Sequence, residues 1–163
     1  MSRAFVKEDG PDLSPLPDLP VSQHPNWVTL RGLTQLQRRL AEVQARLAKL
    51  RGRAERLDLM PEAAAGRDIR YYEARLKSAI LVDQGARGCD EVAFGHAVRV
   101  RDDAGREAIY RIVGEDEAEA EAGLIAPHSP LARALTGGQV GDVVTCQRPA
   151  GTLLLEILEV FWP

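Results

Sequence analysis

Between residues 29 and 58 the apolar positions follow a strict helical period. They recur at alternating spacings of three and four residues, and they are Leu33, Leu36, Leu40, Val43, Leu47, Leu50, Ala54 and Leu57. An uninterrupted seam of this kind is typical of a helix that packs against a single partner helix. The pattern predicts one helix over residues 29–58, about 45 Å long at 1.5 Å per residue.

A second helical seam follows after a short break. Its apolar positions are Ala65, Ile69, Tyr72, Leu76 and Ala79. Pro61 precedes them, at a place that suits the first turn of a helix. Because only a few residues separate the two seams, the helices must run antiparallel. Residues 29–85 are therefore predicted to form a projecting coiled-coil hairpin.

After residue 88 the period changes from helical to alternating. One face of a strand is predicted to carry Val92, Phe94, His96, Val98 and Val100. Further strands are predicted over residues 108–113, 142–147 and 153–162.

A short helix interrupts these strands. Ser129 suits its N-cap, Pro130 suits its first position, and Gly137 with Gly138 ends it. Residues 88–163 thus form a predicted β-β-α-β-β domain, and the whole chain is assigned to the α+β class.

The segment that precedes the first helix has a different character. Five prolines fall within residues 9–25. Proline lacks the amide donor and fixes φ, so residues 1–28 are predicted to be an extended or flexible leader.

The net charge of −3 conceals a strong asymmetry along the chain of 163 residues. Residues 30–87 carry 13 basic and seven acidic side chains, a formal charge of +6. Residues 88–163 carry six and 13, a formal charge of −7. We expect residues 30–87 to contact a negatively charged partner.

Other features of the composition exclude several classes of site. The two cysteines, Cys89 and Cys146, are too few for a disulfide framework and lack the spacing of a zinc or redox motif. No stretch is long and apolar enough to predict a membrane span or a secretory signal, so a cytoplasmic protein is expected.

Five pieces of the C-terminal region, in order, resemble the Gre family of bacterial transcription elongation factors. They are Val92-Ala93-Phe94-Gly95, then residues 112–118, residues 129–135, Gly141-Asp142-Val143-Val144 and Leu155-Glu156-Ile157. The hairpin is similar in architecture, and only the leader falls outside the resemblance.

The resemblance implies an FKBP-like C-terminal domain that docks on core RNA polymerase beside its secondary channel. It also implies a hairpin that enters the channel, where two acidic residues at the tip help to hold the Mg²⁺ of the polymerase active site. The matching positions are Asp58 and Glu62, and the free protein is expected to bind no metal itself. The protein would be an accessory factor to the polymerase, not an enzyme, and a monomer.

The tip departs from the family pattern. The family places its two acids three residues apart, whereas Asp58-Leu59-Met60-Pro61-Glu62 places them four apart, and the hairpin looks shorter. Two variants of the function therefore stay open: a factor that stimulates cleavage of backtracked transcripts, and a non-cleaving modulator that occupies the channel. For Asp58 and Glu62 the alternative to a metal role is an ordinary solvated turn near a helix N-terminus.

Two further groups of residues are candidate contacts. Nascent RNA or the channel could be contacted by the arginines around the tip, which are Arg51, Arg53, Arg56, Arg67 and Arg70. The resemblance places polymerase docking on Glu117, Ile125, Pro127, Ser129, Pro130 and Leu131. The alternatives are an exposed polar face for the arginines and a capped connection for the segment 125–131. The acidic run over residues 115–121 is interpreted as a solvated loop.

Two functions of other classes are weighed against this one. A peptidyl-prolyl isomerase would share the fold, but such pockets are lined by aromatic side chains, which are scarce in residues 88–163. Direct DNA recognition is disfavoured because the charge of −7 on the C-terminal domain would repel phosphates.

Overall fold

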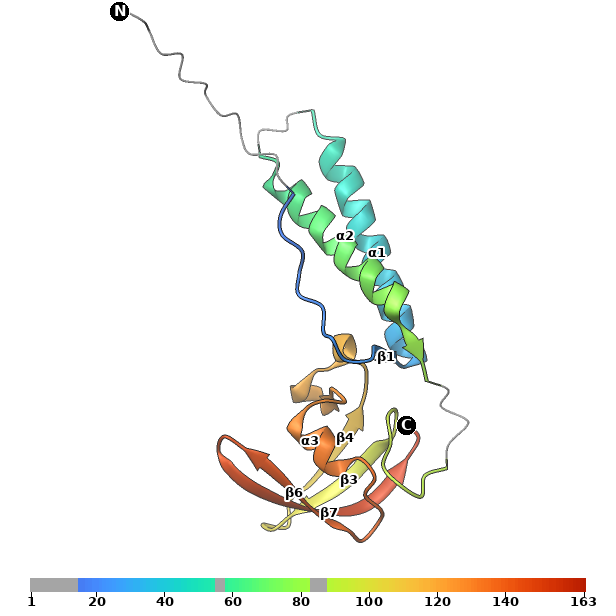
Figure 1. Ribbon diagram of the computed structural model, residues 1–163, viewed down its shortest axis with the longest axis vertical. Helices are drawn as coiled ribbons and strands as arrows, with labels where there is room; N and C mark the ends of the chain where they lie inside the picture. Colours follow the sequence, from blue (N-terminus) through green and yellow to red (C-terminus); the bar gives the residue numbers. More distant parts are fainter. Residues whose placement is uncertain (1–14, 55–57, 83–87) are drawn as a thin grey trace, which may run out of the picture.

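The computed structural model describes residues 15–54, 58–82 and 88–163. A helical hairpin projects from a head, residues 88–163, that is built on a five-stranded sheet (Figure 1). The predicted α+β class, with the hairpin first and the β-β-α-β-β domain second, is confirmed.

Helices α1 (Leu30–Arg51) and α2 (Met60–Ser78) form the hairpin. Their seam encloses three buried side chains, which are Val43, Leu50 and Ala65, with Leu47, Ile69 and Tyr72 packed around them. Full burial of an aliphatic side chain contributes about 1.5–3 kcal/mol, so this seam, and not helix propensity, holds the rod together. No helix in the described part of the chain is long and apolar enough to cross a membrane.

Helix α1 ends earlier than the seam predicts. Its C-cap is Gly52, whose backbone N–H donates to the Ala48 carbonyl at 3.1 Å. Glycine costs about 1 kcal/mol relative to alanine inside a helix, which disfavours continuing α1 through Gly52. Ala54 is exposed and outside the helix, and Leu57 lies outside the described residues. With 22 residues, α1 is about 33 Å long.

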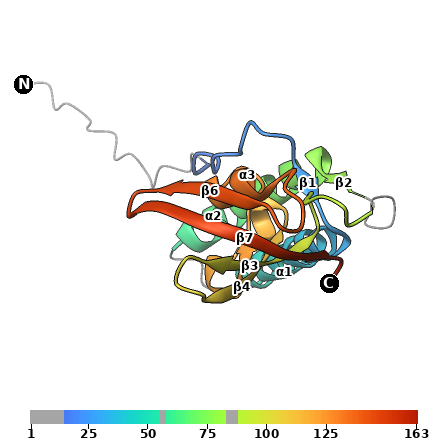
Figure 2. The same ribbon diagram turned by 90° about the horizontal axis from the view of Figure 1, so that it is seen from below.

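The head is a single curved sheet in the order β5-β4-β3-β7-β6. All neighbours are antiparallel except β4 and β5. Figure 2 shows the β6–β7 ribbon curving across the head. The strands are β3 (Ala97–Asp102), β4 (Glu107–Ile112), β5 (Leu124–Ile125), β6 (Val143–Arg148) and β7 (Gly151–Phe161). Two 3₁₀ turns, η1 (Glu115–Glu117) and η2 (Ala120–Ala122), connect β4 to β5.

Helix α3 (Pro130–Leu135) covers one face of the sheet. The Ser129 hydroxyl caps it by accepting from the Ala132 N–H at 3.2 Å, and Pro130 occupies its first turn, as predicted. Ala132 and Leu135 pack from α3 onto sheet residues such as Val98 and Ile157 to complete the core of the head.

The first strand of the head begins later than predicted. The alternating pattern from Val92 to Val100 indicated a single strand, but β3 begins only at Ala97. A turn at Phe94 and Gly95, with φ of +92° at the glycine, interrupts the extended backbone, and a Cβ there would lie 2.8 Å from the Trp162 ring. Every residue from Val92 to Val98 is buried. The apolar positions from Val92 to Val100 therefore belong to a packed turn followed by a strand.

Residues 15–28 of the predicted extended or flexible leader are extended, without a helix, and contact the rest of the chain. This segment runs alongside the hairpin to the head (Figure 1). It ends in β1 (Trp27–Val28), which pairs in parallel with β2 (Ile80–Leu81) just after α2. Its backbone passes so close to the head that a Cβ on Gly114 would lie 2.8 Å from the Trp27 carbonyl oxygen. Prolines restrict only their own φ and donor, and the residues between them supply the contacts.

Candidate functional site

At the hairpin tip, Asp58 is exposed and shapes the start of α2. Its Oδ1 accepts a hydrogen bond from the Met60 backbone N–H at 2.9 Å. Pro61 lies in the first turn of the helix, where its missing amide hydrogen costs nothing. Asp58 therefore acts as a local cap whose carboxylate stays in contact with solvent.

Glu62 is placed differently from Asp58. It lies in the first turn of α2, its side chain is only 12% exposed, and its Oε2 is 4.0 Å from Nε of Arg51 at the end of α1. The structure thus turns Glu62 toward the facing helix. The described residues contain no group of three or more His, Cys, Asp or Glu side chains that could hold a metal ion.

Several of the arginines predicted to contact RNA are paired with the chain itself. Arg67 pairs with Asp68 at 3.1 Å, and Arg70 binds both the Asp18 carboxylate and the Leu16 carbonyl of the leader. Arg51 faces Glu62, Arg53 is exposed just after α1, and Arg56 lies outside the described residues. Most of the positive charge described around the tip is thus already balanced.

The leader contacts the predicted docking segment at His128. Ile125 is buried in β5, and Pro127, Ser129 and Leu131 are half-buried, while Pro130 is exposed. Between Pro127 and Ser129, the His128 ring stacks on His24 of the leader with ring centroids 3.8 Å apart, and the Trp27 ring lies 6.2 Å away. The leader is therefore part of the surface that this segment presents.

Glu117, which the resemblance assigns to polymerase docking, lies next to the start of α1. It is 9% exposed and sits at the junction of hairpin and head. Its Oε1 accepts from the Thr29 hydroxyl at 2.7 Å, and its Oε2 accepts from the Gly114 N–H at 3.2 Å. Thr29 in turn caps α1 by accepting from the Gly32 N–H at 3.0 Å. Glu117 therefore fastens the base of α1 to the head.

A second contact fastens α2 to the same turn of the head. Arg75 is 1% exposed, and its guanidinium donates to Asp116 at 2.6 Å and to Glu115 at 3.3 Å. The Tyr71 hydroxyl donates to the other oxygen of Asp116 at 2.7 Å. Burial, followed by this hydrogen bond, raises the pKa of Tyr71 to about 12. The solvated-loop interpretation of the acidic run is wrong for residues 115–117, although Glu119 and Glu121 are exposed.

One family model matches the head of this chain. The family described as the C-terminal domain of the transcription elongation factors GreA and GreB matches residues 87–161. In this domain the chain is similar to the Gre family. The matched range contains the segment 125–131 but neither helix of the hairpin.

Two curated Gre-family relatives are named transcription elongation factor GreA. Those from Alkalilimnicola ehrlichii and Methylococcus capsulatus are each 45% identical over 94 residues, which is 56% of this chain and 60% of the relative. The alignment thus spans less than two thirds of either relative.

Solved structures of related proteins align over more of the chain. GreA factor homolog 1 of Thermus thermophilus is 22% identical, with 85% of this chain and 99% of that chain covered and a TM-score of 0.40. A GreA/GreB factor of Nitrosomonas europaea is 23% identical, with 83% and 98% covered and a TM-score of 0.42. At these TM-scores the alignments carry no argument about this chain.

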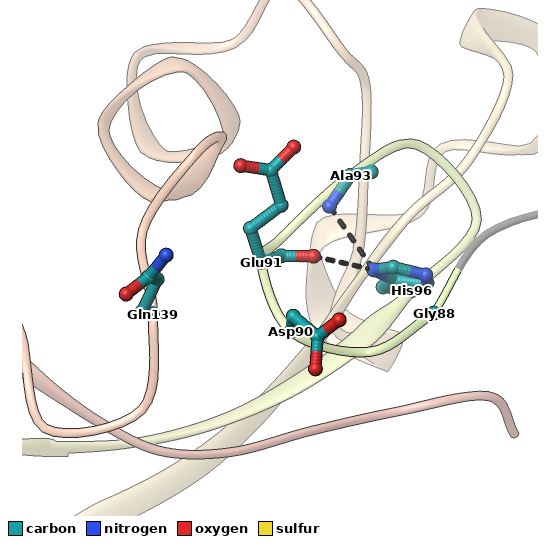
Figure 3. Close-up of a pocket in the computed structure, with 6 residues that line it drawn as sticks. All are labelled: Gly88, Asp90, Glu91, Ala93, His96 and Gln139. Atoms are coloured by element: carbon teal, nitrogen blue, oxygen red, sulfur yellow. Dashed lines mark hydrogen bonds between the residues drawn. The ribbon is translucent and has the colours of Figure 1, made fainter.

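The head has a pocket whose chemistry differs from that of a prolyl isomerase. It is lined by Gly88, Asp90, Glu91, Ala93, His96 and Gln139 (Figure 3). Nδ1 of His96 accepts from the Ala93 N–H at 3.1 Å and lies 3.0 Å from the Glu91 carbonyl oxygen. Apart from the His96 ring, the lining is acidic, amide or small, so it gives the isomerase hypothesis no support.

Sequence reasoning missed the junction of hairpin and head. The junction is formed by side chains that include Thr29, Arg75 and Asp116, and none of them was predicted to make an internal contact. The available signal was the opposite charge of the two pieces, +6 and −7, which indicated that they could bind each other.

Proposed function

We propose that the protein is a transcription elongation regulator that binds core RNA polymerase through its head and inserts its hairpin into the secondary channel. The observation that carries this proposal is the match of residues 87–161 to the C-terminal domain of the GreA and GreB factors. The projecting, leader-braced rod supports it, because a thin helical hairpin is a shape that can enter a channel.

Of the two variants, the geometry favours a non-cleaving modulator. A shared Mg²⁺ needs hard oxygen ligands that are free and close together. Asp58 is exposed, but Glu62 is turned toward Arg51 and is only 12% exposed. The two carboxylates therefore do not fit a metal-holding pair, and we derive no metal-dependent step from them.

Binding is tested by mixing the tagged full chain with bacterial core RNA polymerase and separating the complex by gel filtration. We expect a stable complex that a transcript-cleavage factor displaces, because both would occupy the same channel. A chain that elutes separately from the polymerase would contradict the proposal.

The choice between a non-cleaving modulator and a cleavage factor is tested with backtracked elongation complexes made from purified polymerase. Saturating protein should give no shortened RNA. If shortened RNA appears, and Asp58→Ala abolishes it while Asp103→Ala does not, the protein is a cleavage factor. Asp103 is the matched control because it lies in an exposed turn of the head and carries the same charge.

A further inference from the structure

A surface hollow lies where the base of the hairpin meets the outer side of the sheet. One wall comes from the first turns of α1 and the other from β4. It is lined by Leu30, Arg31, Thr34, Gln35, Arg38 and Arg111. Three guanidinium groups thus gather around one hollow, far from the tip at which RNA contacts were predicted.

The positive charge of this hollow is poorly balanced by the protein. Within residues 15–54, 58–82 and 88–163, neither Arg31 nor Arg111 has a carboxylate oxygen within 4.0 Å, and Arg38 has only the exposed Glu42 at 3.3 Å. Arg111 donates weakly to the Gly95 carbonyl at 3.4 Å. The buried Glu117 is near enough to favour its charge, but both carboxylate oxygens of Glu117 are engaged elsewhere.

Arg111 is held in an environment that disfavours its charge. Partial burial lowers the pKa of Arg111; Glu117 opposes this change, while the like charge of Arg31 adds to it. The contrast with Arg75 is informative, because that buried arginine is matched by both Asp116 and Glu115. Arg75, which joins the hairpin to the head, is paired with carboxylates, whereas Arg31 and Arg111 of the hollow have no carboxylate within 4.0 Å among the described residues. An anion placed between Arg31 and Arg111 would relieve the repulsion.

We propose that this hollow binds the phosphate chain of a nucleotide di- or triphosphate. Guanidinium groups bind phosphate oxygens in a bidentate geometry, and Thr34 and Gln35 add polar groups to the same wall. The lining has no aromatic side chain on which a base could stack, so the phosphates and not the base are recognised.

A short phosphate chain suits the hollow better than a nucleic acid does. Two or three linked phosphates concentrate several negative charges in one place, as the three guanidinium groups require. A long polyanion would also have to approach the head, whose formal charge is −7. This inference does not depend on polymerase binding, and its test uses the free protein.

The experiment titrates the full chain with pyrophosphate, and separately with ATP, by calorimetry at low ionic strength without divalent metal. The double variant Arg31→Gln/Arg111→Gln is compared with Lys49→Gln/Arg133→Gln, which removes the same charge from exposed positions outside the hollow. We expect the first pair to weaken both ligands by about tenfold or more. The control pair should change either affinity by no more than about twofold.

Two further arms make the outcome decisive. Arg31→Gln alone removes an exposed side chain, so it leaves the fold intact and should still weaken pyrophosphate severalfold. A single-stranded RNA oligonucleotide tests the other source of phosphate. The proposal is overturned if Arg31→Gln/Arg111→Gln and the control pair bind pyrophosphate with equal affinity. It is also overturned if the wild type does not bind pyrophosphate at about 1 mM. An RNA oligonucleotide that binds the wild type more tightly than ATP does, and whose binding is lost in Arg31→Gln/Arg111→Gln, would overturn it as well.

Discussion

Arg75 is a buried cation at the junction of hairpin and head. Its guanidinium is 1% exposed and lies against two carboxylates of the head. Replacing it by alanine leaves Asp116 and Glu115 without their cation at a partly buried site. Removal of one partner of a buried pair costs about 3–5 kcal/mol, so Arg75→Ala should lower the free energy of unfolding by that amount.

Urea unfolding followed by circular dichroism measures this loss. The control is Arg99→Ala, because Arg99 pairs with Glu159 on the outer face of the sheet and both side chains are nearly half exposed. That pair should contribute less than about 1 kcal/mol. Similar losses for the two variants would mean that Arg75 is not a structural cation.

Tyr71 makes the same junction sensitive to alkaline pH. Its pKa is raised from 10.0 to about 12, first by burial and then by its hydrogen bond to Asp116. The folded state therefore holds the phenol proton more tightly than the unfolded state does. The resulting contribution to stability is complete below pH 10 and is lost as the pH rises to about 12.

The comparison with Tyr71→Phe isolates this effect, because phenylalanine cannot titrate. The stability of the wild type relative to the variant should fall between pH 10 and about 12. Ultraviolet absorbance of the folded wild type should also show a tyrosine ionisation near pH 12 that the Tyr71→Phe variant lacks. A difference in stability that does not vary with pH would refute the assignment.

At the scale of elements, the start of α1 depends on a capping residue that also binds the head. Thr29 accepts from the Gly32 N–H and donates to the buried Glu117. Thr29→Ala removes both bonds and should destabilise the protein by about 1–3 kcal/mol, measured by thermal unfolding. Thr29→Ser keeps the hydroxyl and should retain most of the stability. If serine and alanine are equally destabilising, the hydroxyl is not what matters.

The helices were predictable because their seams are local. Leu36, Val43 and Leu50 recur at a period that only a helix brings onto one face, and the structure buries all three. The end of α1 was not predictable from this spacing, because the apolar positions continue past the Gly52 C-cap.

Contacts between distant segments left no such periodic signal. The acidic turn at Glu115–Glu117 resembles any solvated charge run, and the cation that neutralises it comes 40 residues earlier, at Arg75. The contacts of the leader were missed for a similar reason. Its prolines dominate the composition, whereas Asn26, which donates to the Arg75 carbonyl at 2.8 Å, and Trp27, which packs on Phe94, anchor it.

For the whole molecule, the charge asymmetry of the sequence reflects in part the pairing of the hairpin with the head. The excess of +6 in residues 30–87 indicated a negative partner. Part of that partner is the head of the same chain, since Arg75 binds Asp116 and Arg39 donates to the Asp116 carbonyl at 3.4 Å. Among the described residues, Arg31 and Arg111 of the hollow are cations that the head does not neutralise in this way.

The junction also predicts how the protein unfolds. Hairpin and head have separate apolar cores, so either could melt alone if nothing joined them. The bonds of Thr29, Tyr71 and Arg75 to the head, together with the β1–β2 pair beside them, should make the two units unfold as one. Calorimetry of the wild type should therefore give a single transition whose calorimetric and van't Hoff enthalpies agree.

The double variant Arg75→Ala/Thr29→Ala tests the origin of that cooperativity. It removes cross-junction bonds while leaving both apolar cores intact, so the hairpin should melt first and the head later, in two resolved transitions. Arg99→Ala/Arg101→Ala is the matched control, because these arginines pair within the sheet of the head and their loss should leave one transition. A single transition in both variants would show that apolar packing alone couples the rod to the head.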